Sequence, residues 1–214
     1  MSADTTNLEL ACKVSQCCKR RGAELEKASP LVSSAAMQIG FARIAVGMAR
    51  WSNEPNGHGE MQTRLANEQF DILNLAPINY ASQTVMTCLD LCAAAAYRLR
   101  DSGNGGKPVK PGQESDLRNL QTRTGHPRDP VVLRKHQAAW LQQVLTDSRL
   151  AVLEDARHNL IHRSFGSHSW VPANTTEFML DGKEYPILQL AIDFTDFAQN
   201  SFEALVAAIQ ADYP

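Results

Sequence analysis

The chain has 214 residues, of which 43% are hydrophobic and 21% charged, and its formal net charge is −2. This is the ordinary composition of a soluble globular protein, and the length suffices for one sizeable domain with or without an appended arm. A net charge this close to zero does not indicate any class of binding partner. The longest apolar stretch, residues 31–49, is interrupted by Arg43 and several small polar residues, so the sequence predicts no membrane-spanning segment.

Charge is distributed unevenly along the chain. The stretch from Arg98 to Lys135 holds nine lysines and arginines against four acids, whereas the stretch from Thr176 to the end holds seven acids and one lysine. A polyanion, if one binds, would therefore meet the middle of the chain. The candidate contacts border a glycine-rich loop and are Lys107, Lys110, Arg118 and Arg123. The simpler interpretation is a solvated basic loop.

Five cysteines are present, and no secretory signal precedes them: Cys12, Cys17, Cys18, Cys88 and Cys92. The first three lack the paired spacing of a zinc ribbon. The last two lie four residues apart in an apolar segment, where buried thiols are common. We therefore predict that all five are reduced and structural, and that the protein is cytoplasmic.

Residues 1–29 are polar with scattered apolar positions, which predicts an N-terminal arm or short helix ahead of one domain of residues 30–214. Ser29 and Pro30 form a cap and a first-turn proline, and the helix that they begin should extend to about Trp51. Apolar side chains line one face of this helix at three- and four-residue steps: Met37, Phe41, Ile44 and Met48.

Residues 60–75 could hold a short helix, and a strong helix is predicted from Pro77 to Arg100. Its expected buried side consists of Tyr80, Val85, Cys88, Leu89, Cys92 and Ala96. Asp90 lies among these apolar neighbours; an exposed acid is the favoured interpretation, and an acid close to a functional site is the alternative. Residues 101–112 contain the clearest flexible loop of the chain.

Asp129 and Pro130 combine a cap and a first-turn proline at the start of the next predicted helix. Its apolar stripe consists of Leu133, Trp140, Leu141, Val144 and Leu145. Whether residues 131–163 form one helix or two stays open, because the polar residues 146–148 interrupt the helical spacing. Residues 164–174 are predicted to be a loop.

A small hairpin is predicted for residues 177–186, because Asp181 and Gly182 stand between two apolar runs. The chain should end with an amphipathic helix from about Leu188 to Ala211, built on Leu190, Phe194, Phe197, Phe202, Leu205 and Ile209. The sequence thus predicts an all-α protein, an antiparallel helical bundle of four to five long helices with one small β-hairpin before the last helix.

Residues 154–163 gather chemically active side chains on about two turns of helix. They include Arg157, His158, Asn159, His162 and Arg163. An arginine presents a fixed fork of donors to a phosphate or carboxylate, and a histidine exchanges protons near neutral pH. Together these residue types can stabilise an anion and move a proton, which is the minimum needed to cleave a phosphodiester.

Metal binding is one interpretation of this segment, because His158, His162 and His168 have the spacing of the metzincin zinc proteases. Two chemical requirements of those proteases are not met. Asn159 stands where a glutamate acts as the general base, and Phe165 stands where a glycine lets the chain turn back. A non-catalytic zinc site formed by the three histidines stays open as an alternative.

The pair Arg157 and His162 leads to a different interpretation. Five helical steps place the two residues roughly 7.5 Å apart along the axis and about 140° around it. Arg-x4-His, with Asn159 close behind the arginine and Arg163 after the histidine, resembles the signature of HEPN domains (higher eukaryotes and prokaryotes nucleotide-binding). A helical bundle with this motif late in a helix, followed by a hairpin and a final helix, fits the family from about residue 30 to residue 212. Many members have the Asn directly after the Arg; here His158 takes that place.

The resemblance implies a metal-independent endoribonuclease of the kind found in toxin–antitoxin and antiphage systems. Arg157 and His162 would be catalytic, with His158, Asn159, Arg163 and Asp90 as supporting candidates and the four basic residues named above as RNA contacts. No cofactor is needed, because the RNA 2′-hydroxyl is the nucleophile, His162 can take its proton and Arg157 can neutralise the transition state. The expected products are a 2′,3′-cyclic phosphate and a 5′-hydroxyl.

The resemblance also implies a homodimer that joins two motifs in one cleft, and it makes an antitoxin a candidate partner; no membrane partner is expected. The principal alternative is a non-catalytic HEPN-like binding or scaffold module. In that case Arg157 would pair with Glu154 or Asp155 on its own helix. A zinc-binding protein is the remaining alternative.

Overall fold

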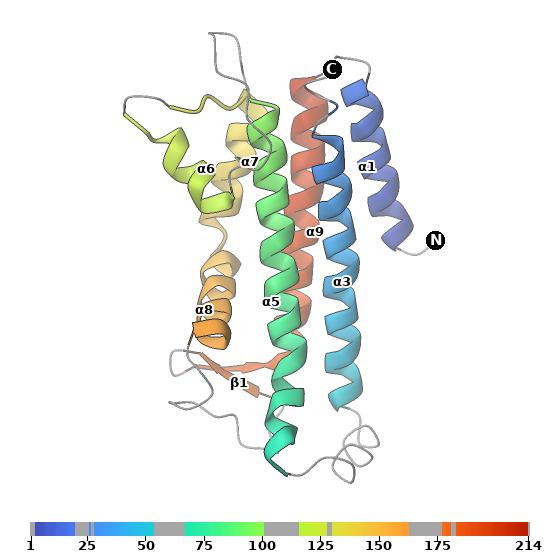
Figure 1. Cartoon of the computed structure of the whole chain (residues 1–214), viewed down its shortest axis with the longest axis vertical. Helices are drawn as coiled ribbons and strands as arrows, with labels where there is room; N and C mark the ends of the chain where they lie inside the picture. The colour runs from blue at the N-terminus through green and yellow to red at the C-terminus, as the bar shows by residue number, and fades with distance from the viewer. Residues whose placement is uncertain are drawn as a thin grey trace. The chain divides into compact units, whose positions relative to one another are not determined.

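The protein is almost entirely helical in the computed structural model, which describes residues 3–19, 26, 28–53, 67–100, 116–127, 130–162, 177–180 and 183–213 (Figure 1). The helices within these ranges are α1 (Ala3–Lys19), α3 (Ser29–Asn53), α5 (Asn67–Arg98), α6 (Leu117–Thr124), α7 (Lys135–Thr146), α8 (Ser148–His162) and α9 (Ile187–Asp212). A hairpin of β1 (Glu177–Leu180) and β2 (Lys183–Pro186) comes between α8 and α9. The prediction of an all-α protein is therefore confirmed.

These elements belong to two compact units. The first consists of residues 1–39, 87–147 and 198–214, and the second of residues 40–86 and 148–197. Each of α3, α5 and α9 contributes one part to each unit. Within the first unit, the amides of Asn7 in α1 and Gln199 in α9 exchange hydrogen bonds of 2.8 and 2.7 Å. The N-terminal helix is thus attached to that unit, and a domain boundary at residue 30 stays a prediction.

Helix α3 confirms the helix predicted from Pro30 to Trp51. An ordinary surface helix buries its large apolar side chains, but α3 exposes most of them. The inward side carries small residues, and its fully buried positions include Val32, Ala35, Ile39, Ala42, Ala45 and Ala49. The large apolar side chains are exposed: Met37 by 54%, Phe41 by 37%, Ile44 by 53%, Met48 by 39% and Trp51 by 42%. Among the described residues, 29–51 is the one stretch long and apolar enough to cross a membrane, a test that core helices also pass.

Helix α5 joins two predicted elements into one. It begins at Asn67, so Pro77 lies inside the helix. The prediction that Pro77 starts the helix is therefore wrong. An interior proline removes one backbone hydrogen bond, which the burial of the following residues offsets. The predicted buried residues Val85, Cys88, Leu89, Cys92 and Ala96 are all buried, but the prediction for Tyr80 is wrong because its side chain is 36% exposed.

Three shorter helices follow. The short helix α6 was not predicted; Asp116 caps it by accepting a 2.7 Å hydrogen bond from the backbone N–H of Asn119. The open question about residues 131–163 is settled: Asp147 has extended backbone angles (φ −71°, ψ 123°) and separates α7 from α8 (Figure 1). The helix start predicted at Asp129 and Pro130 is wrong, because residues 130–134 are not helical and α7 begins at Lys135.

The predicted hairpin and final helix are confirmed. Strands β1 and β2 are antiparallel with Leu180 opposite Lys183, which leaves Asp181 and Gly182 as the two connecting residues. Helix α9 buries every apolar residue predicted for its stripe: Leu190, Phe194, Phe197, Phe202, Leu205 and Ile209. The predicted loops at 101–112 and 164–174 lie outside the described residues.

Candidate functional site

Helix α8 carries the Arg-x4-His motif. Among its residues 148–158, Leu150, Leu153 and Ala156 are buried, which fixes the helix on its apolar side, while Arg157 and His158 are exposed. The Arg157 side chain has no hydrogen bond or ion pair with a residue that the structure describes, so the interpretation in which Glu154 or Asp155 pairs with it has no support there.

The last residue of α8 is His162, so the backbone is helical across the whole motif. The side chains of residues 159–162 lie outside the described part, as do Arg163 and His168 altogether. Five steps of regular helix leave Arg157 and His162 about 140° apart around the axis, so one copy of α8 does not present both on the same face. A shared site therefore requires the arginine to reach around the helix or a second copy to supply the other group.

The carboxylate of Asp90 performs a local task in the first unit. Its Oδ1 accepts a 3.1 Å hydrogen bond from the backbone N–H of Leu117, the first residue of α6. This residue is half-buried rather than exposed. Together with Asp116 it satisfies donors at the helix N-terminus and places negative charge at the positive end of the helix dipole. The position of α6 thus depends on Asp90.

A basic cluster in the first unit contains two of the predicted RNA contacts, Arg118 and Arg123, both exposed on α6. The guanidinium of Arg123 lies 4.9 Å from the centre of the Tyr97 ring, and that of Arg100 lies 4.4 Å from the same ring. A cation over an aromatic face is attracted by the ring quadrupole. Buried Tyr97 therefore holds two arginines against its ring, one from α6 and one from the residues just after α5.

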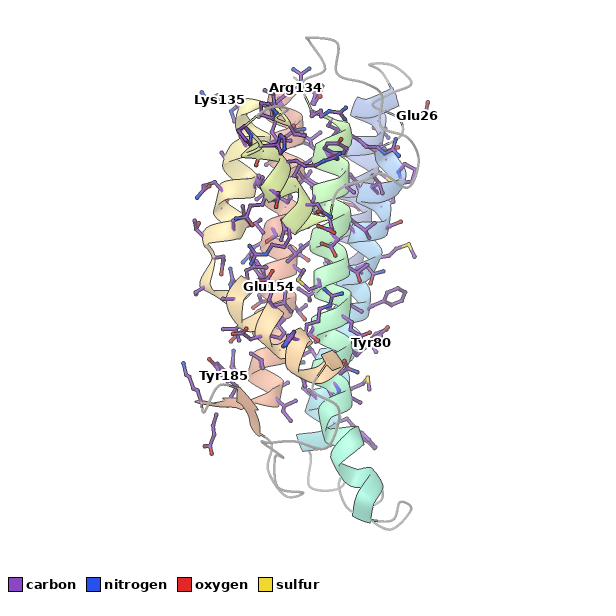
Figure 2. The ribbon with its side chains drawn as sticks, turned by 60° about the vertical axis from the view of Figure 1, so that its left-hand side comes forward. Glu26, Tyr80, Arg134, Lys135, Glu154 and Tyr185 are labelled. Carbon is purple, nitrogen blue, oxygen red and sulfur yellow. The ribbon has the colours of Figure 1, made fainter. Side chains whose placement is uncertain are left out.

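The cluster continues at the start of α7. Arg134 stacks over the ring of Tyr213 at 4.3 Å, and the Tyr213 hydroxyl donates to the backbone carbonyl of Leu99, the residue before Arg100. Figure 2 labels Arg134 and the exposed Lys135 beside it. The buried Nε of Arg134 has no hydrogen-bond partner among the described residues. We call Arg100, Arg118, Arg123, Arg134 and Lys135 the basic cluster; Lys107 and Lys110 lie outside the described part.

This arrangement is suited to binding phosphate groups. The two rings fix the planes of three guanidinium groups, and a fixed guanidinium loses less entropy when it forms paired hydrogen bonds with a phosphate. The sequence indicated Arg118 and Arg123 by their charge alone. It did not reveal the role of Tyr97 and Tyr213, which lie in segments far from α6 and offer no local signal.

The described residues give no group of three potential ligands that could hold a metal ion. Of the zinc alternative only the exposed His158 can be examined, because the other two histidine side chains are not described. Cys12, Cys88 and Cys92 are free thiols. A thiol hydrogen bond with Cys88 raises the pKa of Cys92 well above its ordinary value, and burial raises it further, so the Cys92 thiol stays protonated and unreactive.

No protein-family model, curated protein or solved structure matches the chain.

Proposed function

We propose that the protein is a HEPN-like metal-independent endoribonuclease that cleaves single-stranded RNA. One observation carries the proposal: α8 continues unbroken through the Arg-x4-His motif, ends at His162 and leaves Arg157 exposed. The hairpin and the long helix α9 follow, in the order that the resemblance implies. We also propose that the helices form the antiparallel bundle of that family and that the protein is cytoplasmic.

The chemistry assigned to the motif needs no metal. His162 takes the proton of the RNA 2′-hydroxyl, whose oxygen attacks the adjacent phosphorus as the bond to the 5′-oxygen breaks. Arg157 donates paired hydrogen bonds to the phosphorane-like transition state, where negative charge increases. The leaving 5′-oxygen takes a proton, so the products are a 2′,3′-cyclic phosphate and a 5′-hydroxyl. Since residues 157 and 162 lie about 140° apart around one helix, we propose that two copies of the motif complete the site.

The basic cluster supports an RNA substrate. It contributes four arginines and a lysine with exposed or half-buried side chains in one unit, in a protein whose overall charge is slightly negative. Local positive charge of this kind binds a phosphate backbone without reading its sequence. The supporting roles proposed for His158, Asn159 and Arg163 belong to the same hypothesis, and toxin–antitoxin or antiphage action, with an antitoxin as partner, is its biological extension.

A non-catalytic binding or scaffold module is the second candidate. The divergence of Arg157 and His162 around α8 favours it, because a single chain then has no complete catalytic pair. The exposed large apolar side chains of α3 favour it as well, since contiguous exposed apolar surface marks protein–protein interfaces.

Incubation with labelled single-stranded RNA tests the proposal, with and without EDTA and with DNA of the same sequence as control. We expect cleavage of RNA alone, unchanged by EDTA, and cyclic phosphate termini. Cleavage that EDTA abolishes, or equal cleavage of DNA, would exclude this mechanism. Binding of RNA without any cleavage would support the scaffold module.

A further inference from the structure

The exposed apolar side chains of α3 form a continuous stripe. Its members are Met37, Phe41, Ile44, Met48 and Trp51, spaced by four, three, four and three residues. At 100° per residue all five point within about 80° of one another, along roughly 21 Å of helix. The alternating steps of four and three are those of a helix that packs against another helix. We refer to these five residues as the α3 stripe.

Within α3 itself, the residues that border the stripe carry no charge. Ser33, Gly40 and Gly47 follow one edge at seven-residue intervals, and Ser34 lies on the other edge. The nearest charged residues of the helix, Arg43 and Arg50, point about 120° to 140° away from the middle of the stripe. An uncharged band of large side chains bordered by small ones resembles the centre of an interface, from which charged residues are depleted.

Gly47 provides a second observation. A Cβ added at this position would meet no atom within 4 Å, so packing inside the chain does not require a glycine. A glycine in the interior of a helix nevertheless destabilises it relative to alanine. The glycine is explained if the backbone of another helix comes close at this edge of the stripe.

The exposed area is large enough for a helix pair. The five side chains expose on the order of 450 Å² of mostly apolar surface, which is comparable to the largest patch on a typical monomer. Two such stripes, with the small residues at their edges, bury about 1,000 Å² in total, the lower limit for a specific interface.

A lipid bilayer fits this face less well than a protein helix does. A membrane span is apolar all round, but the opposite side of α3 carries Val32, Ala35, Ile39, Ala42 and Ala49 into the core, and Arg43 and Arg50 lie at the edge of that side. A helix lying on a membrane surface carries lysines and arginines along the border of its apolar face. The border of the α3 stripe carries glycine and serine instead.

The order of the side chains along the α3 stripe favours a second copy of α3 as the partner. Ile44 is the middle of the stripe, with Met37 and Trp51 seven residues away on either side and Phe41 and Met48 three and four residues away. When a second α3 lies antiparallel across a twofold axis at Ile44, Met37 lies level with Trp51 of the other copy, and Met48 lies within one residue of the level of Phe41. Methionine sulfur and aromatic rings attract each other, and twofold contacts must be self-complementary in this way.

We propose that the protein forms a homodimer in which the α3 stripes of two copies pack antiparallel around Ile44. This inference rests on the surface of α3 alone, and it holds whether or not the protein cleaves RNA. The interface proposed here lies on α3, so it is a separate contact from the pairing of two α8 motifs in the proposed function.

The twofold position of Ile44 permits a decisive experiment. Ile44→Glu and Ile44→Lys each place two like charges against each other in the dimer, which should weaken association more than about a hundredfold. Mixing the two variants pairs opposite charges and should restore a one-to-one heterodimer. Sedimentation equilibrium of the wild type, each variant and the mixture measures this. Arg50→Glu is the matched control on the same helix and should leave the dimer intact.

Because Ile44 is 53% exposed, both variants should retain the helical circular dichroism of the wild type. A monomeric wild type, including one that binds anionic lipid vesicles, would overturn the proposal. So would a dimer that survives both Ile44 variants, or two monomeric variants that fail to associate when mixed.

Gly47→Ala should change the stability of the monomer and the affinity of the dimer in opposite directions. The substitution should stabilise the monomer, because it removes a glycine from a helix and its Cβ has open space. It should weaken the dimer, because the added methyl group separates the two helices. A Gly47→Ala protein that is more stable to denaturant and also associates at least as tightly as the wild type would contradict a close helix contact at this edge.

Discussion

His136 and Asp212 form the contact that fixes the beginning of α7. The Nδ1 of His136 lies 2.7 Å from Oδ1 of Asp212, and the backbone N–H groups of His136 and Gln137 donate to the same carboxylate at 3.1 and 3.0 Å. The N-cap residue of α7 is Arg134, whose side chain makes no capping hydrogen bond. The last residue of α9 therefore caps the first turn of α7, and Gln137 of α7 itself accepts a 3.3 Å hydrogen bond from the backbone N–H of Arg134.

Replacement of Asp212 should reveal this cap through its pH dependence. Burial alone would raise the pKa of Asp212, but the hydrogen bonds from His136 and from the two backbone N–H groups outweigh it and lower the pKa. A lowered carboxyl pKa stabilises the fold fully above its ordinary value near about 4, and this stabilisation is lost as the pH falls through the lowered native value. Asp212→Asn should cost about 1–3 kcal/mol of unfolding free energy at neutral pH.

The measurement is urea unfolding of the wild type and of Asp212→Asn at a series of pH values. The difference in unfolding free energy should narrow on going from neutral pH to below about pH 3. The exposed Asp196 on the same helix provides the control, and Asp196→Asn should change little at any pH. A difference that is constant over the whole range would show that the charge of Asp212 contributes nothing.

The His136–Asp212 contact also shows why the sequence predicted some helix ends and missed others. Helix α3 begins at Ser29, beside the start that Ser29 and Pro30 predict, and the stripe of α9 depends on its own period, so local reasoning sufficed for both. The start of α7 depends on a carboxylate 76 residues away. No local signal marks it, and Asp129 and Pro130 offered a misleading one.

The two faces of α3 mark a second limit. Periodicity correctly placed Met37, Phe41, Ile44 and Met48 on one face, but it could not tell that the alanine face is the buried one, because both faces are apolar. Residue size decides here, since alanines permit close packing of the helix inside the chain. The candidate site shows the same division: the charges of Arg118 and Arg123 were visible in the sequence, whereas their stacking on a tyrosine of α5 follows from the fold.

The hydrogen-bonded amides of Asn7 and Gln199 should couple α1 to α9. Asn7 is buried, so removal of Gln199 leaves the Asn7 amide without these two hydrogen bonds, whereas the Gln199 amide also donates to Glu203. Asn7→Ala and Gln199→Ala should each destabilise the protein by about 1–3 kcal/mol, and the double variant by clearly less than the sum. Chemical unfolding of the four proteins gives the coupling energy. Additive losses would mean that the two amides do not act as a pair.

Neutralisation of the basic cluster should reduce the salt dependence of RNA binding. Each phosphate contact to single-stranded RNA contributes roughly 0.7 to the slope of log affinity against log salt concentration. Arg118→Gln with Arg123→Gln should therefore weaken binding and lower the slope by roughly 1.4 if each arginine contacts one phosphate. Fluorescence anisotropy over a salt series measures both quantities. Arg50→Gln, an exposed arginine of the second unit, is the control, and an unchanged slope in the double variant would assign the cluster to solvated surface.

The sharpest prediction separates the two histidines of α8, because the ribonuclease and zinc hypotheses assign them different roles. His162→Ala and Arg157→Ala should each reduce the rate of RNA cleavage by roughly a hundredfold or more, the usual effect of losing a general base or a transition-state donor. The double variant should be little worse than either single one, because residues that act as a unit are not additive. His158→Ala, which changes an exposed side chain one position from Arg157, should retain most activity and stability. RNA cleavage and bound zinc are measured for all four variants, and equal damage from the two histidine variants with loss of zinc in both would replace the ribonuclease mechanism with a metal site.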